Sequence, residues 1–419
     1  MKKLNKLVAI LVAMAMVMAL SVVSAFAEQS AAKEVALADA YLTKQLNTPA
    51  GIADIPTIEA TFSFDLDTEK SSGLSNTEIA NKTPAIGDQT ISVTGAANQT
   101  TTATKALSTF TPTFTHAGVY AYTVEEKSAS ITGVAALVDN ADASVSKDSA
   151  KYTLRFYVVA ETTTDTTDPE NPVTTTSYNV KYVTVNREVA GNAGETGKVD
   201  ASKTDGTGFN FVNNYAYKDG TEPTNPEGPV TPGEKDKFAL VIEKEVTNHD
   251  GDTQAFPISV KLEKALGQTE NTVIGRVFDK DGNKVGDSKT FTYGEAQTVN
   301  LKTGEYLAFE TLPTGTKWSA SELLNNETAY QVYTPSFAGT ANDTAISGNA
   351  GAGLTLATDE YTLQQDKEDD VKYTNAYDDS LNTPTGILMN NLPYIVLALV
   401  AIGGLCAYVI VRRKNADEA

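Results

Sequence analysis

A lysine, a glutamate and an asparagine recur in the same order in the two halves of this 419-residue chain. They are Lys44, Glu126 and Asn213 in the first half, and Lys244, Glu322 and Asn375 in the second. A lysine amine held against an asparagine amide can displace ammonia and form an isopeptide bond, if a carboxylic acid helps to move the protons. The recurrence predicts one reaction of the chain with itself, without turnover of an outside substrate.

The local patterns predict that these groups are buried. A strand points alternate side chains to one face, so Asn213 shares a face with Phe211, and Lys44 shares a face with Leu42. The second half repeats both arrangements. Burial disfavours charge, so it lowers the pKa of a lysine and raises the pKa of a glutamate. The expected result is a neutral amine beside an acid that can polarise the amide carbonyl.

The same residues also fit a structural role. An asparagine on a strand is more often a hydrogen-bonded core or edge residue than an electrophile. Because its amide reacts poorly, the fold would have to hold the pair in contact, and orientation alone can reach effective molarities of ~10⁵ to 10⁸ M. The pattern aromatic-x-apolar-x-Glu selects Glu126 over Glu125 as the counterpart of Glu322. Spacing alone leaves both interpretations open.

Other arrangements for catalysis or metal binding are incomplete. His116 and His249 are the only histidines, so a histidine-based triad or a multi-histidine metal site is not expected. The segment 279–283 begins like a calcium loop, but Thr290 stands where a bidentate glutamate is needed, which favours a hairpin turn. The segment 312–315, Leu-Pro-Thr-Gly, has no apolar span after it and is expected to be a turn. No cofactor and no metal are predicted.

Alternation with a period of two predicts strands throughout. In the first half, 152–158 and 178–182 are expected to pair across the loop 162–176. In the second half, strands are expected at 238–246, 257–262, 272–278, 290–293, 305–310 and 370–377. Abundant threonine, valine and tyrosine, with few long helical patterns, predict an all-β fold of sandwich domains.

Proline, glycine and charge concentrate between the two halves, which predicts a semi-rigid linker there. The expected organisation is a signal peptide at 1–27, a β-sandwich domain at 28–217, the linker at 218–236, a second β-sandwich domain at 237–380 and a C-terminal segment at 381–419.

The N-terminal segment has the features of an export signal. Lysines precede an apolar run, and the small-x-small triplet Ala-Phe-Ala follows it, so cleavage is expected between Ala27 and Glu28.

The C-terminal segment combines a membrane span with a cleavable strand. Residues 392–411 carry no charge and precede a basic cluster, as expected of a span that obeys the positive-inside rule. Just upstream, Pro384 keeps the chain extended and Gly386 leaves the Thr385 carbonyl uncrowded. This layout is typical of a sortase sorting signal, with cleavage between Thr385 and Gly386.

The chain is acidic, with 33 basic and 53 acidic side chains and a formal net charge of −20. Such a chain repels phosphates and anionic membrane surfaces, so nucleic acid is not an expected partner, and the membrane is contacted only transiently through the C-terminal span. The single cysteine, Cys406, lies inside that span. Disulfides therefore cannot hold the exported part, and any covalent reinforcement must use other side chains.

Several segments resemble the T-antigen-type backbone pilins of Gram-positive bacteria. The resemblance lies in residues 118–126, in the two aromatic-x-Asn-x-Tyr strands, and in the tail, where Pro-Tyr-Ile at 393–395 precedes a glycine pair at 403–404. It implies two tandem immunoglobulin-like domains of the collagen-adhesin-B type. In each, a lysine of the first strand is joined to an asparagine of the last, assisted by a glutamate.

Carried over by motif, the resemblance implies specific pairs. Lys44 would join Asn213 with the help of Glu126, and Lys244 would join Asn375 with the help of Glu322. The family also uses a lysine near the end of the first domain to attack the sortase-bound carboxyl of the next subunit.

The best-placed residue for this intersubunit lysine is Lys203, with Lys198 as the alternative. An ordinary solvated lysine in a glycine-rich loop is an equal interpretation of Lys203.

The main functional expectation is a secreted, cell wall-anchored pilus subunit on the surface of a Gram-positive bacterium. Its expected partners are sortase, copies of itself in a covalent polymer, peptidoglycan and accessory pilins. The alternative is a monomeric wall-anchored adhesin with the same domains and tail. A secreted enzyme is a third and weaker hypothesis, because no complete catalytic set is recognised.

Overall fold

The computed structural model describes residues 33–165, 173–225, 229–231, 233–378 and 380. The expected signal cleavage at Ala27 and Glu28, the sorting site at Thr385 and Gly386, and the span 392–411 lie outside the described residues. Within the described ranges, no helix has the length and apolar character needed to cross a membrane.

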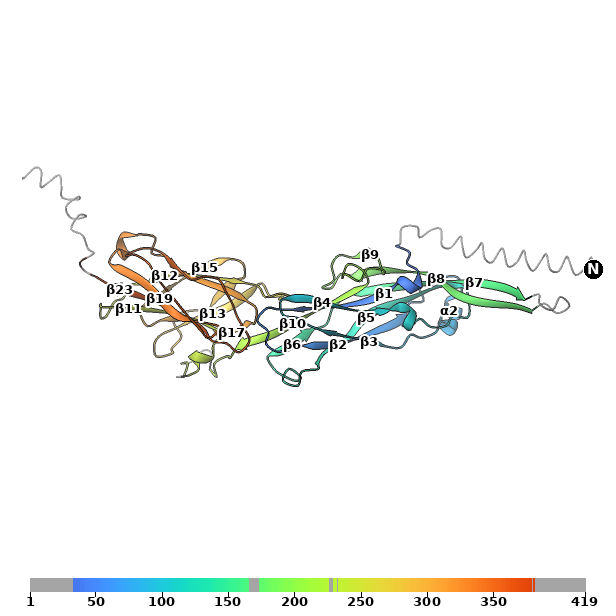
Figure 1. The fold of residues 1–419 in the computed structure, drawn as a ribbon, viewed down its shortest axis with the longest axis horizontal. Helices are drawn as coiled ribbons and strands as arrows, with labels where there is room; N and C mark the ends of the chain where they lie inside the picture. Colours follow the sequence, from blue (N-terminus) through green and yellow to red (C-terminus); the bar gives the residue numbers. More distant parts are fainter. Residues whose placement is uncertain (1–32, 166–172, 226–228, 232, 379, 381–419) are drawn as a thin grey trace, which may run out of the picture.

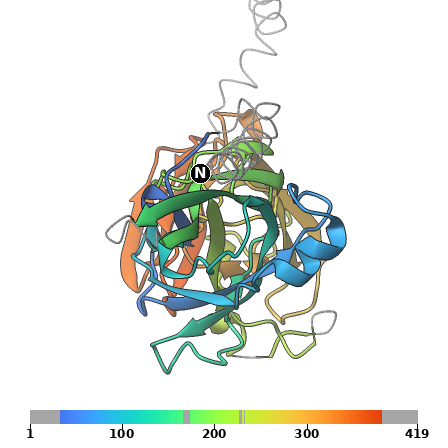
Figure 2. The same cartoon turned by 90° about the vertical axis from the view of Figure 1, so that its right-hand side faces the viewer.

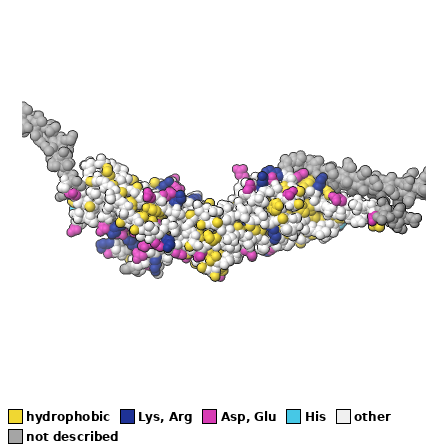
Figure 3. All heavy atoms as spheres, in the orientation of Figure 1, with side chains coloured by type: hydrophobic (Ala, Val, Ile, Leu, Met, Phe, Trp, Pro, Cys, Tyr) yellow, Lys and Arg dark blue, Asp and Glu magenta, His cyan; other side chains and the backbone are white. Residues whose placement is uncertain are grey.

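The chain is built almost wholly of strands, which confirms the all-β prediction. We call residues 33–220 the N-terminal unit and residues 238–377 the C-terminal unit, and Figure 1 shows them arranged end to end in an elongated molecule. Viewed along the long axis, the strands surround a compact cross-section (Figure 2). Acidic and basic side chains are interspersed on the face seen in Figure 3.

Two sheets form the N-terminal unit. One has the order β3-β2-β5-β7-β8-β9 and consists of β2 (Thr57–Leu66), β3 (Gln89–Thr94), β5 (Gly118–Thr132), β7 (Lys151–Asp165), β8 (Val173–Val189) and β9 (Gly197–Val199). The other consists of β4 (Gln99–Ala106), β1 (Tyr41–Thr48) and β10 (Asn210–Gly220), with β6 (Ala143–Ser146) beside β10.

Two further sheets form the C-terminal unit. The larger has the order β14 (Lys289–Thr292), β13 (Thr272–Phe278), β16 (Tyr306–Phe309), β11 (Leu240–Thr247), β23 (Asp369–Tyr377), β19 (Tyr333–Ala341) and β20 (Thr344–Asn349). The smaller has β15 (Ala296–Leu301), β12 (Phe256–Glu263) and β18 (Lys317–Glu322), with β21 (Leu356–Ala357) and β22 (Tyr361–Thr362) beside β18.

Within the part of the chain that the structure describes, the helical segments are short. They are α2 (Asn76–Lys82) and the single 3-10 turns η1 (Leu37–Asp39), η2 (Leu107–Thr109), η3 (Lys235–Lys237) and η4 (Thr328–Tyr330). A capping box starts α2, because Ser75 and Glu78 satisfy each other's backbone N–H groups.

Alternating hydrophobic residues place the core between the sheets of each unit. Strand β12 alternates strictly between buried and half-buried positions, as a strand with one core-facing side should. In the N-terminal unit, the rings of Phe62 and Phe211 meet from opposite sheets with centroids 5.0 Å apart. In the C-terminal unit, Trp318 is fully buried.

The first and last strands of each unit are parallel neighbours. Strand β1 pairs with β10, and β11 pairs with β23. Because these parallel strands are far apart in sequence, residues from both ends of a unit lie side by side along the line where the two strands pair, which we call the seam. This shared topology positions the candidate site in both units.

The expected hairpin in the first half forms, and it is longer than expected. Strands β7 and β8 pair from Lys151 to Asp165, so residues 162–165 and 173–176 of the expected loop are strand. Threonine accounts for the extension: Thr162 faces Thr176, and Thr164 faces Thr174, with hydroxyl oxygens 3.3 Å apart in both pairs.

Strand β10 continues through Gly220, past the start of the expected linker, and pairs there with β17 (Thr311–Pro313) of the C-terminal unit. Segment 312–315 therefore ends an interunit strand and then turns at Gly315, which has a φ of +88° and packs against Ala50. Segment 279–283 is a turn in which the Asp279 carboxylate accepts backbone N–H groups.

Candidate functional site

The first candidate site lies at the seam between β1 and β10. In the parallel register Lys44 is opposite Phe211, and Leu46 is opposite Asn213. The lysine and the asparagine therefore point into the same core, two positions apart, within reach of the long lysine side chain. Lys44 and Asn213 are completely buried, and Glu126 on the opposite sheet is 2% exposed.

These three side chains contact one another directly. The Lys44 amine donates to Glu126 Oε2 at 3.0 Å and to Asn213 Oδ1. The Asn213 amide Nδ2 donates to Glu126 Oε1 at 2.8 Å. Neighbouring Glu125 instead faces outward and pairs with Lys151 at 2.8 Å. Each of the three groups, the lysine amine, the asparagine amide and the glutamate carboxyl group, thus contacts the other two.

The second candidate site lies at the corresponding seam of the C-terminal unit. Lys244 is opposite Tyr373, and Val246 is opposite Asn375. The Lys244 amine lies 3.0 Å from Glu322 Oε1, and Asn375 Nδ2 donates to the same oxygen at 2.8 Å. The lysine, the glutamate and the asparagine are all 0% exposed.

The two sites differ in how their polar atoms are satisfied. In the second site the Lys244 amine also donates to the carbonyl of Tyr373 at 3.3 Å. Glu322 Oε2 and Asn375 Oδ1 have no hydrogen-bond partner among the described residues. The first site has no such open atom among Lys44, Glu126 and Asn213.

Burial lowers the pKa of both lysine amines and so favours their neutral form. It lowers the pKa of Lys44 to about 8, against the opposing attraction of Glu126. It lowers the pKa of Lys244 to about 8 as well, and there Glu322 opposes the change. Aromatic rings line both pockets, since Phe62 lies 6.0 Å from the Lys44 amine and Phe256 lies 4.6 Å from the Lys244 amine. A neutral buried amine is a nucleophile.

The arrangement supports amide exchange. Attack of a lysine nitrogen on the asparagine Cγ forms a new C–N bond, and loss of the amide nitrogen as ammonia breaks the old one. The glutamate lies where it can accept a proton from the amine and return one to the leaving nitrogen. The bond formed would join the first and last strands of a unit.

Lys203 and Lys198 belong to neither trio. Lys198 is exposed on β9, and Lys203 is exposed in the turn between β9 and β10, where its backbone N–H donates to the Asp200 carbonyl at 3.1 Å. Both amines are accessible to a large partner. Both lysines therefore remain candidates for the intersubunit amine.

One residue at the first site was missed by the sequence analysis. Asp148 is 1% exposed, and its backbone N–H donates to Glu126 Oε2 at 2.8 Å. It lies just before β7 in an ordinary polar segment, so no local pattern distinguishes it. Only the fold brings it against the glutamate.

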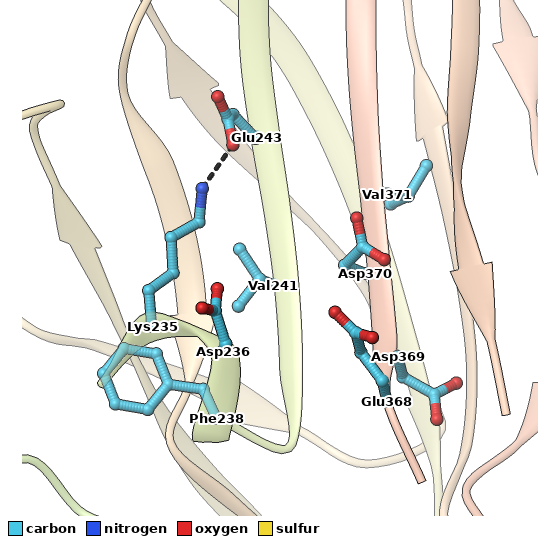
Figure 4. A pocket seen from close by; sticks show the side chains of 9 residues that line it. All are labelled: Lys235, Asp236, Phe238, Val241, Glu243, Glu368, Asp369, Asp370 and Val371. Carbon is cyan, nitrogen blue, oxygen red and sulfur yellow. Dashed lines mark hydrogen bonds and ion pairs between the residues drawn. The ribbon is translucent and has the colours of Figure 1, made fainter. Parts of the chain in front are cut away.

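A separate recess lies beside η3 and β23 (Figure 4). Lys235 and Asp236 lie on one side of it and Glu368 and Asp370 on the other, and the Lys235 amine pairs with Glu243. Among the described residues, no group of three or more histidine, cysteine, aspartate or glutamate side chains could hold a metal ion. The recess is therefore lined largely by charged side chains, and we assign no function to it.

Comparisons with known proteins bear on the C-terminal unit and on the chain as a whole. Residues 238–382 match a family described as a domain of unknown function, DUF7601. A curated protein named Pilin, from Streptococcus pyogenes serotype M1, is 26% identical over 184 residues. That alignment spans 43% of this chain and 50% of the relative. The chain is similar to a pilin. The expected resemblance to Gram-positive pilins is confirmed.

Solved structures that match the chain include pilus proteins. The major pilin from Streptococcus pyogenes matches at 20% identity, covers 81% of this chain and 98% of its own, and has a TM-score of 0.31. A pilus-presented adhesin, Spy0125, matches at 17% identity over 46% of this chain and 37% of its own, with a TM-score of 0.21.

Proposed function

We propose that this chain is a structural subunit of a covalently assembled pilus and that two intramolecular Lys-Asn isopeptide bonds reinforce it. The observation that carries the proposal is the buried trio of amine, carboxyl and amide, which occurs at the same seam in both units. Similarity to a protein named Pilin supports the proposed setting. The reaction is a single intramolecular step, so the chain is not an enzyme in the usual sense.

The position of the bonds suits a protein under tension. Force that enters at Lys203 or Lys198 would pass along β10, which continues into the junction with the C-terminal unit. A bond between Lys44 and Asn213 would tie β10 covalently to its parallel neighbour β1, so that β10 could not be pulled out of the unit. Hydrogen-bond ladders alone yield strand by strand. A bond between Lys244 and Asn375 would do the same in the C-terminal unit.

Assembly in this proposal joins the C-terminal sorting segment of one copy to a lysine in the N-terminal unit of another. Sortase would cleave between Thr385 and Gly386 and transfer the Thr385 carboxyl to Lys203, or to Lys198, of another copy. The last carboxyl would be transferred to peptidoglycan, and accessory pilins would join by the same chemistry. The membrane would be contacted only until cleavage.

Intact-mass spectrometry of the full chain tests the cross-links. We expect a mass lower than the sequence mass by two ammonia molecules, and peptides that join Lys44 to Asn213 and Lys244 to Asn375 after digestion. A chain with its full sequence mass would contradict the proposal. A chain that lacks one ammonia would restrict it to the unit whose cross-linked peptide is found.

A further inference from the structure

Asp148 holds three separate pieces of backbone in the N-terminal unit. Its Oδ1 accepts N–H groups from Ala150 at 2.9 Å and from Asn192 at 2.8 Å, and its Oδ2 accepts the N–H of Val212 at 2.7 Å. Val212 immediately precedes Asn213. A carboxylate that accepts three backbone N–H groups is strongly fixed, and it fixes the segments that it bonds.

The same residue is bonded to the glutamate of the first site. Its backbone N–H donates to Glu126 Oε2, the oxygen that also accepts from Lys44. The other oxygen, Oε1, is left for Asn213 Nδ2. The carboxyl group is therefore oriented with one oxygen toward the amine and the other toward the amide.

The second site shows what happens without such a donor. There Lys244 and Asn375 share the single oxygen Oε1 of Glu322, and Oε2 has no partner among the described residues. Only in the first site, therefore, does one carboxyl oxygen contact the amine and the other contact the amide. There the backbone N–H of Asp148 is the additional donor.

We propose that Asp148 is a positioning residue for the cross-link between Lys44 and Asn213, because it holds Glu126 with one oxygen for the amine and one for the amide. The inference rests on the proposed function and adds a residue to it. Asp148 does not touch the reacting carbon. It acts through Glu126 and through the backbone beside Asn213.

The orientation matches the proton transfers that the reaction needs. The neutral Lys44 nitrogen attacks the Asn213 Cγ and then gives up one of its two protons to Glu126 Oε2. The protonated carboxyl then supplies a proton through Oε1 to the departing Nδ2, which leaves as ammonia. One C–N bond forms, one breaks, and Glu126 ends as it began. Separate oxygens let the two transfers occur without rotation of the carboxyl group.

A neighbouring glycine shows how tightly Asp148 is held. Gly191 has a φ of +54°, and a Cβ there would collide with Asp148 Oδ1 and with the backbone of Ala150. A substitution at Gly191 would displace the Asp148 side chain while leaving every charge of the site in place. It therefore provides a second variant that is independent of the charge of Asp148.

The test follows the rate of each bond in the same molecule. The full chain is made by cell-free synthesis, captured in denaturant and refolded, and the two cross-linked peptides are quantified over time by mass spectrometry. In Asp148→Ala and in Gly191→Ala, the bond between Lys44 and Asn213 should form ~10-fold more slowly or worse, since a placed acid-base group is worth ~10² to 10⁴ in rate. The bond between Lys244 and Asn375 should keep its wild-type rate.

Asp205→Ala is the matched control. Asp205 also accepts a nearby backbone N–H, from Thr207, but it is exposed and is not bonded to Glu126. Both bonds should form in this variant at wild-type rates.

A pH profile separates positioning from a general loss of packing. Asp148 is a negative charge that raises the pKa of Lys44 against the larger effect of burial. Asp148→Asn should therefore move the midpoint of the rate profile at the first site to lower pH, whereas Gly191→Ala should slow the reaction without moving the midpoint.

The possible failures are distinguishable. A wild-type chain that forms neither bond contradicts the proposed function. A wild-type chain that forms both, with unchanged first-site rates in Asp148→Ala and Gly191→Ala, overturns only the role of Asp148. Equal slowing of both bonds would also overturn it, because Asp148 would then act on folding as a whole.

Discussion

Gln365 of the C-terminal unit is hydrogen-bonded to the backbone of Ala53 in the N-terminal unit. Its side-chain Oε1 accepts the Ala53 N–H at 3.1 Å, and its own backbone N–H donates to the Gly51 carbonyl at 3.0 Å. Gln365 is only 6% exposed. Together with the pairing of β10 and β17, these bonds join the two units by backbone contacts on more than one side. The junction is therefore built to resist bending.

Gln365→Ala should loosen this junction. The substitution removes the side-chain acceptor of the backbone N–H groups of Ala53 and Asp54, and a typical hydrogen bond contributes about 0.5 to 1.5 kcal/mol. We expect small-angle X-ray scattering to report a wider range of interunit angles, and both cross-linked peptides to remain. Gln364→Ala is the control, because that side chain is exposed. Identical scattering from both variants and the wild type would contradict the prediction.

Local periodicity in the sequence correctly predicted which residues face the core and where several strands lie. Alternation placed Lys44 and Asn213 on core-facing positions, and both are fully buried. It also located β12 and β13 closely, at Phe256–Glu263 and Thr272–Phe278. These predictions succeed because burial of one strand face is a property of neighbouring residues.

Local periodicity does not encode nonlocal relationships, and the two trios were predicted only from the repeat and the family resemblance. The parallel register that sets Lys44 two positions from the partner of Asn213 joins residues from opposite ends of the unit. The role of Asp148 depends on three backbone segments that meet only in the fold. The junction through β17 was hidden for the same reason, since its residues form an ordinary turn pattern.

Glu322→Gln should leave the bond between Lys244 and Asn375 unformed. Glutamine keeps the size of the side chain and one acceptor oxygen, but it cannot take the proton from the amine. Peptide mapping should show the cross-link of the N-terminal unit alone. The melting temperature of the C-terminal unit should fall on the order of 10 °C, by analogy with removal of a disulfide that closes a long loop.

The control for this experiment is Glu327→Gln, at an exposed position of the same unit. It should preserve both bonds and the melting temperature. Full cross-linking in Glu322→Gln would show that the carboxyl group is dispensable.

Asp369 should make the C-terminal unit less stable as the pH rises. It is 1% exposed, Trp318 Nε1 donates to its Oδ1 at 2.8 Å, and burial raises its pKa to about 7. Because the folded state holds this proton more tightly than the unfolded state, the stabilising contribution is complete below about pH 4 and is lost as the pH rises through 7.

Urea denaturation followed by Trp318 fluorescence at pH 5 and pH 8 measures this effect. Asp369→Asn should reduce the difference in unfolding free energy between the two pH values by on the order of 2 kcal/mol, because a tenfold change in proton affinity corresponds to about 1.4 kcal/mol. Asp359→Asn, at an exposed position, should leave the difference as it is in the wild type. An equal pH dependence in all three chains would contradict the assignment to Asp369.

Lys203→Arg should abolish polymerisation if Lys203 is the amine that receives the Thr385 carboxyl. Arginine keeps the positive charge but is not deprotonated in proteins, so it cannot serve as the nucleophile. Lys203 is exposed and belongs to neither buried trio, so the substitution should leave the two internal bonds intact. Cells that express the wild type should show a ladder of SDS-resistant species on immunoblots, and the variant should show one band. Lys198→Arg is the matched variant, and loss of the ladder there alone would move the role to Lys198. A single anchored band from the wild type itself would favour the monomeric adhesin.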